Sequence, residues 1–320
     1  MVKRKFNVNT ESKVLDLIII GAGIAGCTAA IYAARKKMNY AFISEMFGGQ
    51  FNESGEVLNY PGIVETTGAD FSKLMEEQLK FNDVKLQTGM VVNKIIKKGK
   101  NFLVQTDKKE YLTKTIIIAT GSKPRRLTVP GEEKYQKMGL TYCAICDGPL
   151  FKGKDVAIVG GGNSALEAVD FLDKVARKIY LININDKFNA HEYLVERIKK
   201  EKKIIILNNA ETIAIVGGKF VTGLKYEQKG KTKEITVSGV FVEIGRTANT
   251  DFVKGLVEID EHGHIKVDCQ TNSSVPGIFA VGDCSSVHEY QYIISAGTGC
   301  LALLKAAKYL TTLSGGGKKK

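Results

Sequence analysis

The sequence predicts an α/β protein that contains two Rossmann-like units. Two glycine-rich turns, which start at Gly21 and Gly160, indicate these units, because each turn follows an apolar strand and precedes a helix. The length agrees, since 320 residues exceed one ordinary core and suit two domains. The composition, with 44% hydrophobic and 25% charged residues, is that of a soluble globular protein.

The first unit begins with an apolar strand over 14–20, VLDLIII, which runs into GAGIAG and an alanine-rich helix. Gly21, Gly23 and Gly26 have the G-x-G-x-x-G spacing. The first glycine permits a tight turn, the second lets the backbone approach a pyrophosphate, and the third allows close packing of helix and strand. Glu45, after the next strand, lies close to where a ribose-binding carboxylate is expected. This unit is therefore predicted to bind a dinucleotide at the helix start.

The same pattern occurs again after a strand over 155–159, DVAIV. Gly160, Gly162 and Ala165 have the G-x-G-x-x-A spacing, and a further apolar strand, IYLINI, follows the helix. Two such units imply two different dinucleotides. The natural combination is a flavin that stays bound and a nicotinamide that exchanges.

Two further strands end in polar turns. Residues 115–121, TIIIATG, predict a buried strand, and GIFAVGDCSS places Gly282 and Asp283 after another one. An acid at such a strand end suits the ribityl or pyrophosphate part of a flavin nucleotide. Taken alone, Asp283 would equally suit the N-cap of the following helix.

Two of the six cysteines, Cys143 and Cys146, form a Cys-x-x-Cys pair within TYCAICDG. Such a pair could bind zinc, form a structural disulfide or transfer electrons. No second Cys or His pair lies at a zinc-ribbon distance, so no metal site is predicted. Cys27 and Cys300 suit small core positions. The first residues contain no secretory signal, so we expect a reducing, cytoplasmic location, where a lone pair is redox-active more often than structural.

The formal charge of +12 comes from lysines spread along the chain. A nucleic-acid-binding protein would concentrate basic residues on one surface, so we predict a solvated surface that attracts anionic cofactors. No apolar run approaches the roughly 18 residues of a membrane span, and no membrane association is predicted.

The ordered motifs GAGIAG, FGGQ, NYPG, ATG, YCAICDGPLFKGK, GGGNSA, FVEIGRTANT, GIFAVGDC and SAGTG resemble those of the low-molecular-weight thioredoxin reductases. They are equally similar to the flavoprotein core of alkyl hydroperoxide reductase, and the resemblance covers roughly 14–312. It implies a discontinuous FAD domain into which the second domain is inserted. The implied segments are a flexible arm at 1–13, the FAD domain at 14–122 and 253–312, an NAD(P)-type domain with the cysteine pair at 123–252, and a flexible basic tail at 313–320.

The resemblance also implies residue roles. Cys146 would be the thiol next to the flavin, Cys143 the thiol that attacks the partner protein, and Asp147 the general acid. If the pair opens a short helix, the helix dipole would lower a thiol pKa. The implied FAD contacts are Gly21, Gly23, Gly26, Glu45, Gln50, Asn59, Thr120, Gly121, Gly282, Asp283 and Gln291. The implied nicotinamide-dinucleotide contacts are Gly160, Gly162, Asn163, Ser164, Ala165, Asn183 and Gly245. Turn chemistry alone could also explain Gln50 and Asn59.

The second nucleotide site departs from the family pattern. NADPH-dependent members carry His-Arg-Arg and a further Arg after the second strand, whereas this chain has Asn183, Ile184, Asn185 and Asn189. The guanidinium groups that bind a 2′-phosphate are missing, so NADPH is disfavoured. NADH, whose 2′-hydroxyl Asn183 could bind, and a ferredoxin or deazaflavin donor are the alternatives.

The partner implied by the resemblance is a thioredoxin-like or glutaredoxin-like protein, acting directly or as the carrier of a peroxiredoxin system. A homodimer is also implied. A hypothesis of a different class is a flavin-binding redox sensor with little turnover, which the intact CxxCD motif disfavours.

Overall fold

The computed structural model describes residues 14–54 and 56–315. The predicted arm at 1–13 lies outside the described residues. The predicted tail at 313–320 starts inside helix α7 (Tyr292–Gly315). Its last five residues, 316–320, also lie outside the described residues.

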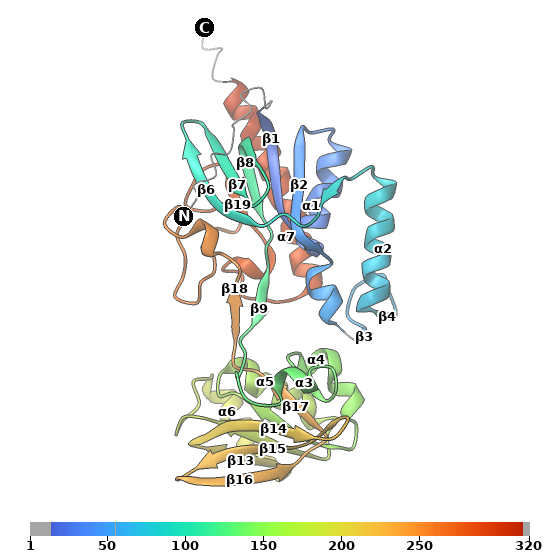
Figure 1. Ribbon diagram of the computed structural model, residues 1–320, viewed down its shortest axis with the longest axis vertical. Coiled ribbons are helices and arrows are strands. Elements are labelled where there is room, and N and C mark those ends of the chain that lie inside the picture. Colours follow the sequence, from blue (N-terminus) through green and yellow to red (C-terminus); the bar gives the residue numbers. More distant parts are fainter. Residues whose placement is uncertain (1–13, 55, 316–320) are drawn as a thin grey trace. The chain divides into compact units, whose positions relative to one another are not determined.

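The chain divides into two compact units (Figure 1). Unit 1 combines the described residues up to Lys123 with those from Thr247 onward, and unit 2 spans Pro124–Arg246. The crossings between them are β9 (Ser122–Pro124) and β18 (Arg246–Ala248), which pair with each other. Unit 1 is therefore discontinuous in sequence.

A seven-stranded sheet forms the centre of unit 1, in the order β5-β2-β1-β8-β7-β6 with β19 beside β8. Its strands are β1 (Leu15–Ala22), β2 (Tyr40–Phe47), β5 (Leu86–Gln87), β6 (Val92–Lys98), β7 (Asn101–Thr106), β8 (Glu110–Ile118) and β19 (Ile278–Ala280). The strands β5, β2, β1, β8 and β19 are mutually parallel, whereas β7 and β6 continue the sheet in antiparallel fashion.

Both faces of this sheet are covered. Leu17 and Ile19 of β1 belong to a core shared with α1 (Ile24–Arg35), α2 (Gly68–Phe81) and α7. Ile18 and Ile20 point to the opposite face, into a second core with Val253 and Ile265. This double burial explains why VLDLIII is nearly continuous in apolar residues instead of alternating.

Unit 2 has a five-stranded parallel sheet and a three-stranded antiparallel sheet. The parallel sheet contains, in spatial order, β10 (Leu140–Thr141), β17 (Gly239–Val242), β11 (Asp155–Val159), β12 (Lys178–Asn183) and β13 (Ile204–Asn208). The other sheet contains β14 (Ala210–Gly217), β15 (Val221–Gln228) and β16 (Lys231–Thr236). Helices α5 (Asn163–Asp173) and α6 (Glu192–Lys200) cover one face of the parallel sheet, and the antiparallel sheet covers the other.

Shorter elements complete both units. They are η1 (Gly49–Glu53), β3 (Glu56–Val57), β4 (Thr66–Thr67), η3 (Asp251–Val253) and η4 (Gly282–Cys284) in unit 1, and α3 (Glu132–Tyr135), α4 (Ala144–Asp147) and η2 (Gly148–Phe151) in unit 2. Three of them, η1, η4 and α4, carry residues of the candidate site.

Among the described residues, one helix is long and apolar enough to span a membrane by length and composition alone. It is the Tyr292–Leu313 part of α7, with a mean hydropathy of 1.2. Ala302, Leu303 and Ala306 of this helix are fully buried in the core that also contains α1. The contacts of α7 are thus those of a core helix of unit 1.

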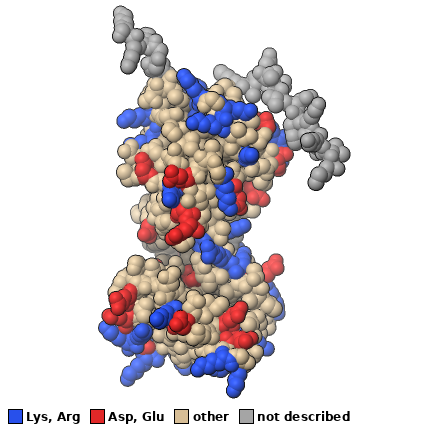
Figure 2. All heavy atoms as spheres, turned by 90° about the vertical axis from the view of Figure 1, so that its left-hand side faces the viewer, with Lys and Arg blue, Asp and Glu red and all other residues tan. Residues whose placement is uncertain are grey.

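Charged side chains of both signs lie on the face of the molecule in Figure 2, in unit 1 and in unit 2. Lysine and arginine are interspersed there with aspartate and glutamate. Mixed charges of this kind on one face are typical of a solvated surface.

Candidate active site

The cysteine pair opens a short helix in unit 2. Cys143 and Cys146 form a disulfide with a sulfur–sulfur distance of 2.07 Å, and Cys143 is the N-cap of α4. The backbone N–H of Cys146 donates to Sγ of Cys143 over 3.2 Å. An N–H group that points at this sulfur would stabilise a thiolate there once the disulfide is reduced.

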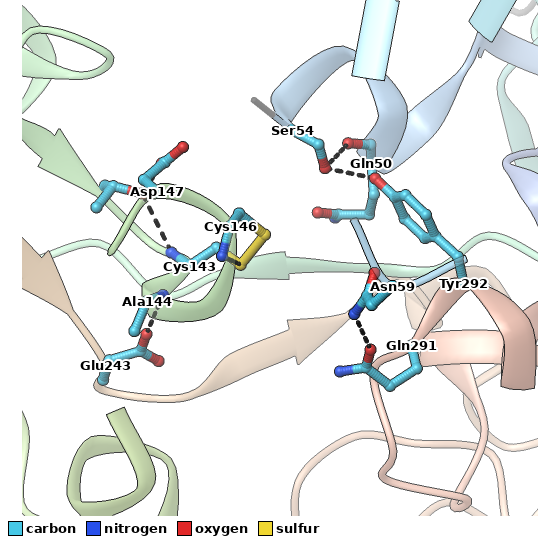
Figure 3. The surroundings of a disulfide bond; sticks show 11 residues. Gln50, Ser54, Asn59, Cys143, Ala144, Cys146, Asp147, Glu243, Gln291 and Tyr292 are labelled. Atoms are coloured by element: carbon cyan, nitrogen blue, oxygen red, sulfur yellow. Dashed lines mark hydrogen bonds between the residues drawn. A yellow bond between two sulfur atoms is a disulfide. The ribbon is translucent and has the colours of Figure 1, made fainter. Parts of the chain in front are cut away.

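Asp147 lies at the end of α4, next to the disulfide (Figure 3). The hydroxyl of Thr141 donates to Oδ2 of Asp147 and accepts the backbone N–H of Cys143 over 3.2 Å. Burial raises the pKa of Asp147, although the Thr141 hydrogen bond and the charge of Lys137 oppose this effect. A carboxyl group with a raised pKa beside a thiol pair can hold a proton for a leaving thiolate.

A second carboxyl group, that of Glu243, lies on the other side of α4. Its Oε1 accepts the N–H of Ala144, the first of the two residues between the cysteines, over 3.3 Å (Figure 3). Burial raises the pKa of Glu243 to about 7, from 4.5 for an ordinary glutamate. Sequence reasoning missed this residue. The available signal was a charged residue directly after the apolar strand GVFV.

The glycine turn of unit 1 has the expected close contacts. Gly21 has a φ of +103°, and a Cβ there would lie 2.3 Å from the carbonyl oxygen of Ala119. A Cβ on Gly26 would lie 1.8 Å from the carbonyl oxygen of Gly21. Gly23, in contrast, has no atom within 4 Å of such a Cβ, so the space before the helix start is open. An open backbone cradle at the start of α1 fits a pyrophosphate.

Other predicted FAD contacts lie at the same edge of the unit 1 sheet. Glu45 is exposed near the end of β2, Thr120 and Gly121 follow β8, and Gly282 and Asp283 follow β19. Because these strands are parallel to β1, their carboxyl ends meet at one edge, where doubly wound folds bind ligands. The fold thus brings this group of predicted residues together with the glycine turn.

The remaining predicted FAD contacts are held by hydrogen bonds within unit 1. Gln50 Nε2 donates to the Ser122 carbonyl oxygen over 2.9 Å, and Asn59 Nδ2 donates to Gln291 Oε1 over 3.2 Å (Figure 3). Asn249, which sequence reasoning did not select, bonds reciprocally with Thr120, at 2.7 Å and 3.0 Å. These contacts position the amides, and their role toward FAD stays a prediction.

In unit 2 the second glycine turn is also tightly packed. A Cβ on Gly160 would lie 2.2 Å from the carbonyl oxygen of Glu243, and Ala165 is fully buried. Gly162 has only the Asn189 carbonyl oxygen nearby, at 3.8 Å from such a Cβ. Asn163 Oδ1 accepts the N–H of His191 over 2.8 Å. Of the other predicted contacts, Ser164 is exposed and Gly245 has a φ of +92°.

The side chain of Asn183 turns inward at the end of β12. Asn183 is 1% exposed, and its Nδ2 donates to the Lys187 carbonyl oxygen and to Asn208 Oδ1, both at 3.1 Å. Its Oδ1 accepts the N–H of Asn185 over 3.3 Å. Such an amide braces the strand end, which weakens the prediction that it binds a ribose hydroxyl. The exposed side chains that follow are Ile184, Asn185, Asp186 and Lys187.

The chain matches the family model of the pyridine nucleotide-disulphide oxidoreductases over residues 15–300. It is 38% identical to a subunit of the alkyl hydroperoxide reductase of Staphylococcus aureus strain MSSA476 over 298 residues, which are 92% of this chain and 59% of that protein. The chain therefore spans well under two thirds of the length of this relative.

Two solved structures extend the comparison. The thioredoxin reductase of Streptococcus pyogenes MGAS5005 has 35% identity and a TM-score of 0.84, with 93% of this chain and 99% of that chain covered. A ferredoxin-flavin thioredoxin reductase from Clostridium acetobutylicum has 30% identity and a TM-score of 0.54, with 94% and 99% covered.

Proposed function

Because the chain belongs to the pyridine nucleotide-disulphide oxidoreductase family, we propose that it is an FAD-dependent disulfide reductase whose partner is a thioredoxin-like protein. The observation that carries this proposal is the Cys143–Cys146 disulfide at the start of α4, beside the carboxyl group of Asp147. The full-length similarity to solved thioredoxin reductases supports it.

FAD is assigned to unit 1, where Gly23 leaves an open cradle and Glu45 and Asp283 lie at the same sheet edge. The amides of Gln50 and Gln291 complete the proposed set. When bound, FAD would link the transfer of a hydride or of single electrons to the reduction of a disulfide. Thiols alone do not perform this conversion.

The disulfide exchange uses the reduced cysteine pair. The Cys143 thiolate attacks one sulfur of the partner disulfide, a mixed disulfide forms, and the second partner sulfur leaves as a thiolate that takes a proton from Asp147. Cys146 then attacks Cys143 Sγ, the mixed disulfide breaks, and the departing partner sulfur takes the proton of the Cys146 thiol, so the partner is released as a dithiol. Two electrons and two protons pass to the partner, and the Cys143–Cys146 disulfide is restored.

The proposal also concerns the electron donor that reduces the flavin. The turn at Gly160 and Gly162 suits the pyrophosphate of a nicotinamide dinucleotide, and the absence of arginine after β12 disfavours NADPH. We favour NADH, with a ferredoxin-type donor as the alternative, since one structural relative is named as a ferredoxin-flavin enzyme.

A second candidate function is the flavoprotein reductase of a peroxiredoxin system. The 38% identity to part of an alkyl hydroperoxide reductase favours it. Both functions use the same cysteine pair and differ in the partner protein. The family resemblance further predicts a cytoplasmic location and a homodimer. Light scattering on the purified protein would test the homodimer.

The decisive experiment is an anaerobic titration of the bound flavin with NADH, NADPH, reduced ferredoxin and reduced deazaflavin, followed by flavin absorbance. We expect NADH to bleach the flavin at lower concentrations than NADPH. The reduced enzyme is then mixed with oxidised thioredoxin, glutaredoxin and a peroxiredoxin, and free thiols are counted. If no donor reduces the flavin, the reductase proposal is wrong. The hypothesis of a flavin-binding redox sensor with little turnover would then be favoured.

A further inference from the structure

Three of the four histidines of the chain lie together in unit 1. His262 and His264 belong to a turn between the bridged residues Ile259 and Ile265, and His288 follows η4. The ring centroids of His264 and His288 are 4.6 Å apart, and those of His262 and His264 are 6.4 Å apart. The turn also contributes a carboxylate, that of Asp260.

The two oxygens of Asp260 have different surroundings. Oδ1 accepts the backbone N–H groups of His262 and His264, each over 2.9 Å. Oδ2 is buried and accepts no hydrogen bond from any described residue, although His288 Nε2 lies 3.2 Å from it. A buried, charged oxygen is thus left for another ligand.

His264 is oriented by both of its ring nitrogens. Its Nδ1 lies 3.3 Å from Asp260 Oδ1, and its Nε2 lies 2.9 Å from the hydroxyl of Tyr290. The side chain is only 2% exposed. A neutral imidazole, held through its second nitrogen, is the form in which histidine binds metal ions.

A simpler explanation would be an ordinary hydrogen-bonded Asp–His pair. That explanation accounts for His264, but it leaves Asp260 Oδ2 and the adjacent His288 unexplained. A single divalent cation between these groups would be bound by the carboxylate oxygen and by both imidazoles.

We propose that Asp260, His264 and His288 bind one divalent first-row transition-metal ion, for which zinc is the probe. The ligands are Asp260 Oδ2, His264 Nδ1 and His288 Nε2. One ligand atom from each residue lies within 4.8 Å of the others. Zinc bonds of about 2.0–2.1 Å require roughly 3.4 Å between ligand atoms, so small side-chain rotations close the site. His288 is 45% exposed, which leaves the fourth position to water.

Such an ion would join two segments of unit 1. The Asp260–His264 turn would be cross-linked to the segment between η4 and α7, which runs from Ser285 to Gln291. The metal site is independent of the proposed reductase activity, because it needs neither the disulfide nor a reduced flavin. Sequence analysis predicted no metal site, and the pattern D-x-H-x-H at 260–264 was the available signal.

The test is equilibrium dialysis and calorimetry of the full flavin-loaded chain with ZnCl₂, with the disulfide oxidised so that Cys143 and Cys146 cannot bind zinc. A Cys269→Ser background removes the exposed thiol. We expect one zinc per chain, and at least about tenfold weaker binding in His288→Gln and in Asp260→Asn. The matched control is His191→Gln, which changes the fourth histidine, in unit 2, and should bind zinc as the background protein does.

His288 and His191 are both surface residues, so their variants should fold, which circular dichroism would verify. Zinc should also raise the melting temperature of the background protein and not that of His288→Gln. Absence of saturable binding to the background protein would overturn the proposal. Equal affinity of the background protein and His288→Gln would overturn it as well.

Discussion

The protonation of Glu243 should make the stability of the protein depend on pH. The change that isolates this effect is Glu243→Gln, which keeps the shape of the side chain and an oxygen acceptor for the Ala144 N–H. The variant removes only the titration. All other ionisable groups are common to both proteins, so their effects cancel in the comparison.

The expected magnitude follows from the raised pKa. The folded state holds the Glu243 proton up to about pH 7, whereas an ordinary glutamate releases it near 4.5. The contribution of Glu243 to stability is therefore complete below about pH 4.5 and is lost as the pH rises through 7. Between pH 5 and pH 8 the loss is about 2.5 kcal/mol at most, since 1.36 kcal/mol corresponds to one pKa unit and partial exposure reduces the effect.

The assay is urea unfolding at pH 5, 6, 7 and 8, followed by circular dichroism because the chain contains no tryptophan. Wild type and Glu243→Gln are compared with the disulfide oxidised in both. We expect the free energy of unfolding of the variant, relative to that of wild type, to increase as the pH rises, with equal m values for both proteins. A difference that is independent of pH, or that changes in the opposite direction, would refute the assigned pKa and the burial that causes it.

Three further predictions concern the cysteines and the two glycine turns. Cys146→Ser should trap a mixed disulfide between Cys143 and oxidised thioredoxin on a non-reducing gel, and Cys143→Ser should trap none; a stable adduct of Cys143→Ser would reverse the assigned roles. Gly26→Ala should lower the free energy of unfolding in urea by at least about 3 kcal/mol and reduce the FAD content, because its Cβ would lie 1.8 Å from a carbonyl oxygen. A normal FAD content and stability would show that the helix start can move. The double change Ile184→Arg and Asn185→Arg should strengthen NADPH binding by about tenfold or more, because charge-assisted bonds to the 2′-phosphate form. The control, in which both residues are changed to alanine, should not strengthen it. Equal NADPH affinity in both variants would mean that the second turn binds no NADP-type ligand.

The Rossmann-like architecture could be predicted from the sequence because its signals are local. An apolar strand, a turn such as GAGIAG and an alanine-rich helix each reflect a steric requirement that neighbouring residues satisfy. The packing at Gly21 and Gly26 shows this requirement directly, as their Cβ positions are occupied by backbone atoms.

Features that depend on tertiary contacts could not be predicted in this way. Glu243 is apart from the cysteines in sequence by nearly a hundred residues and meets Ala144 only because β17 ends beside α4. Asn183 looked available to a ribose, yet its amide is used by Asn208 from the neighbouring strand β13. The proposed metal site depends on His288, whose Nε2 lies 3.2 Å from Asp260 Oδ2. In all three cases the environment of the side chain depends on residues that are distant in sequence.

The insertion of unit 2 between β8 and β19 has a consequence for biosynthesis. β19 pairs with β8 through residues such as Phe279 and Ile117, and α7 packs on α1, yet both elements leave the ribosome only after all of unit 2. Unit 2 is contiguous and can fold as soon as it emerges, whereas the first part of unit 1 must wait with one sheet edge and the apolar surface of α1 uncovered. The late pairing spans a long stretch of chain, which slows its formation. During translation, the first domain to begin is thus the last to be completed, and its unfinished form is the state that most needs protection from aggregation.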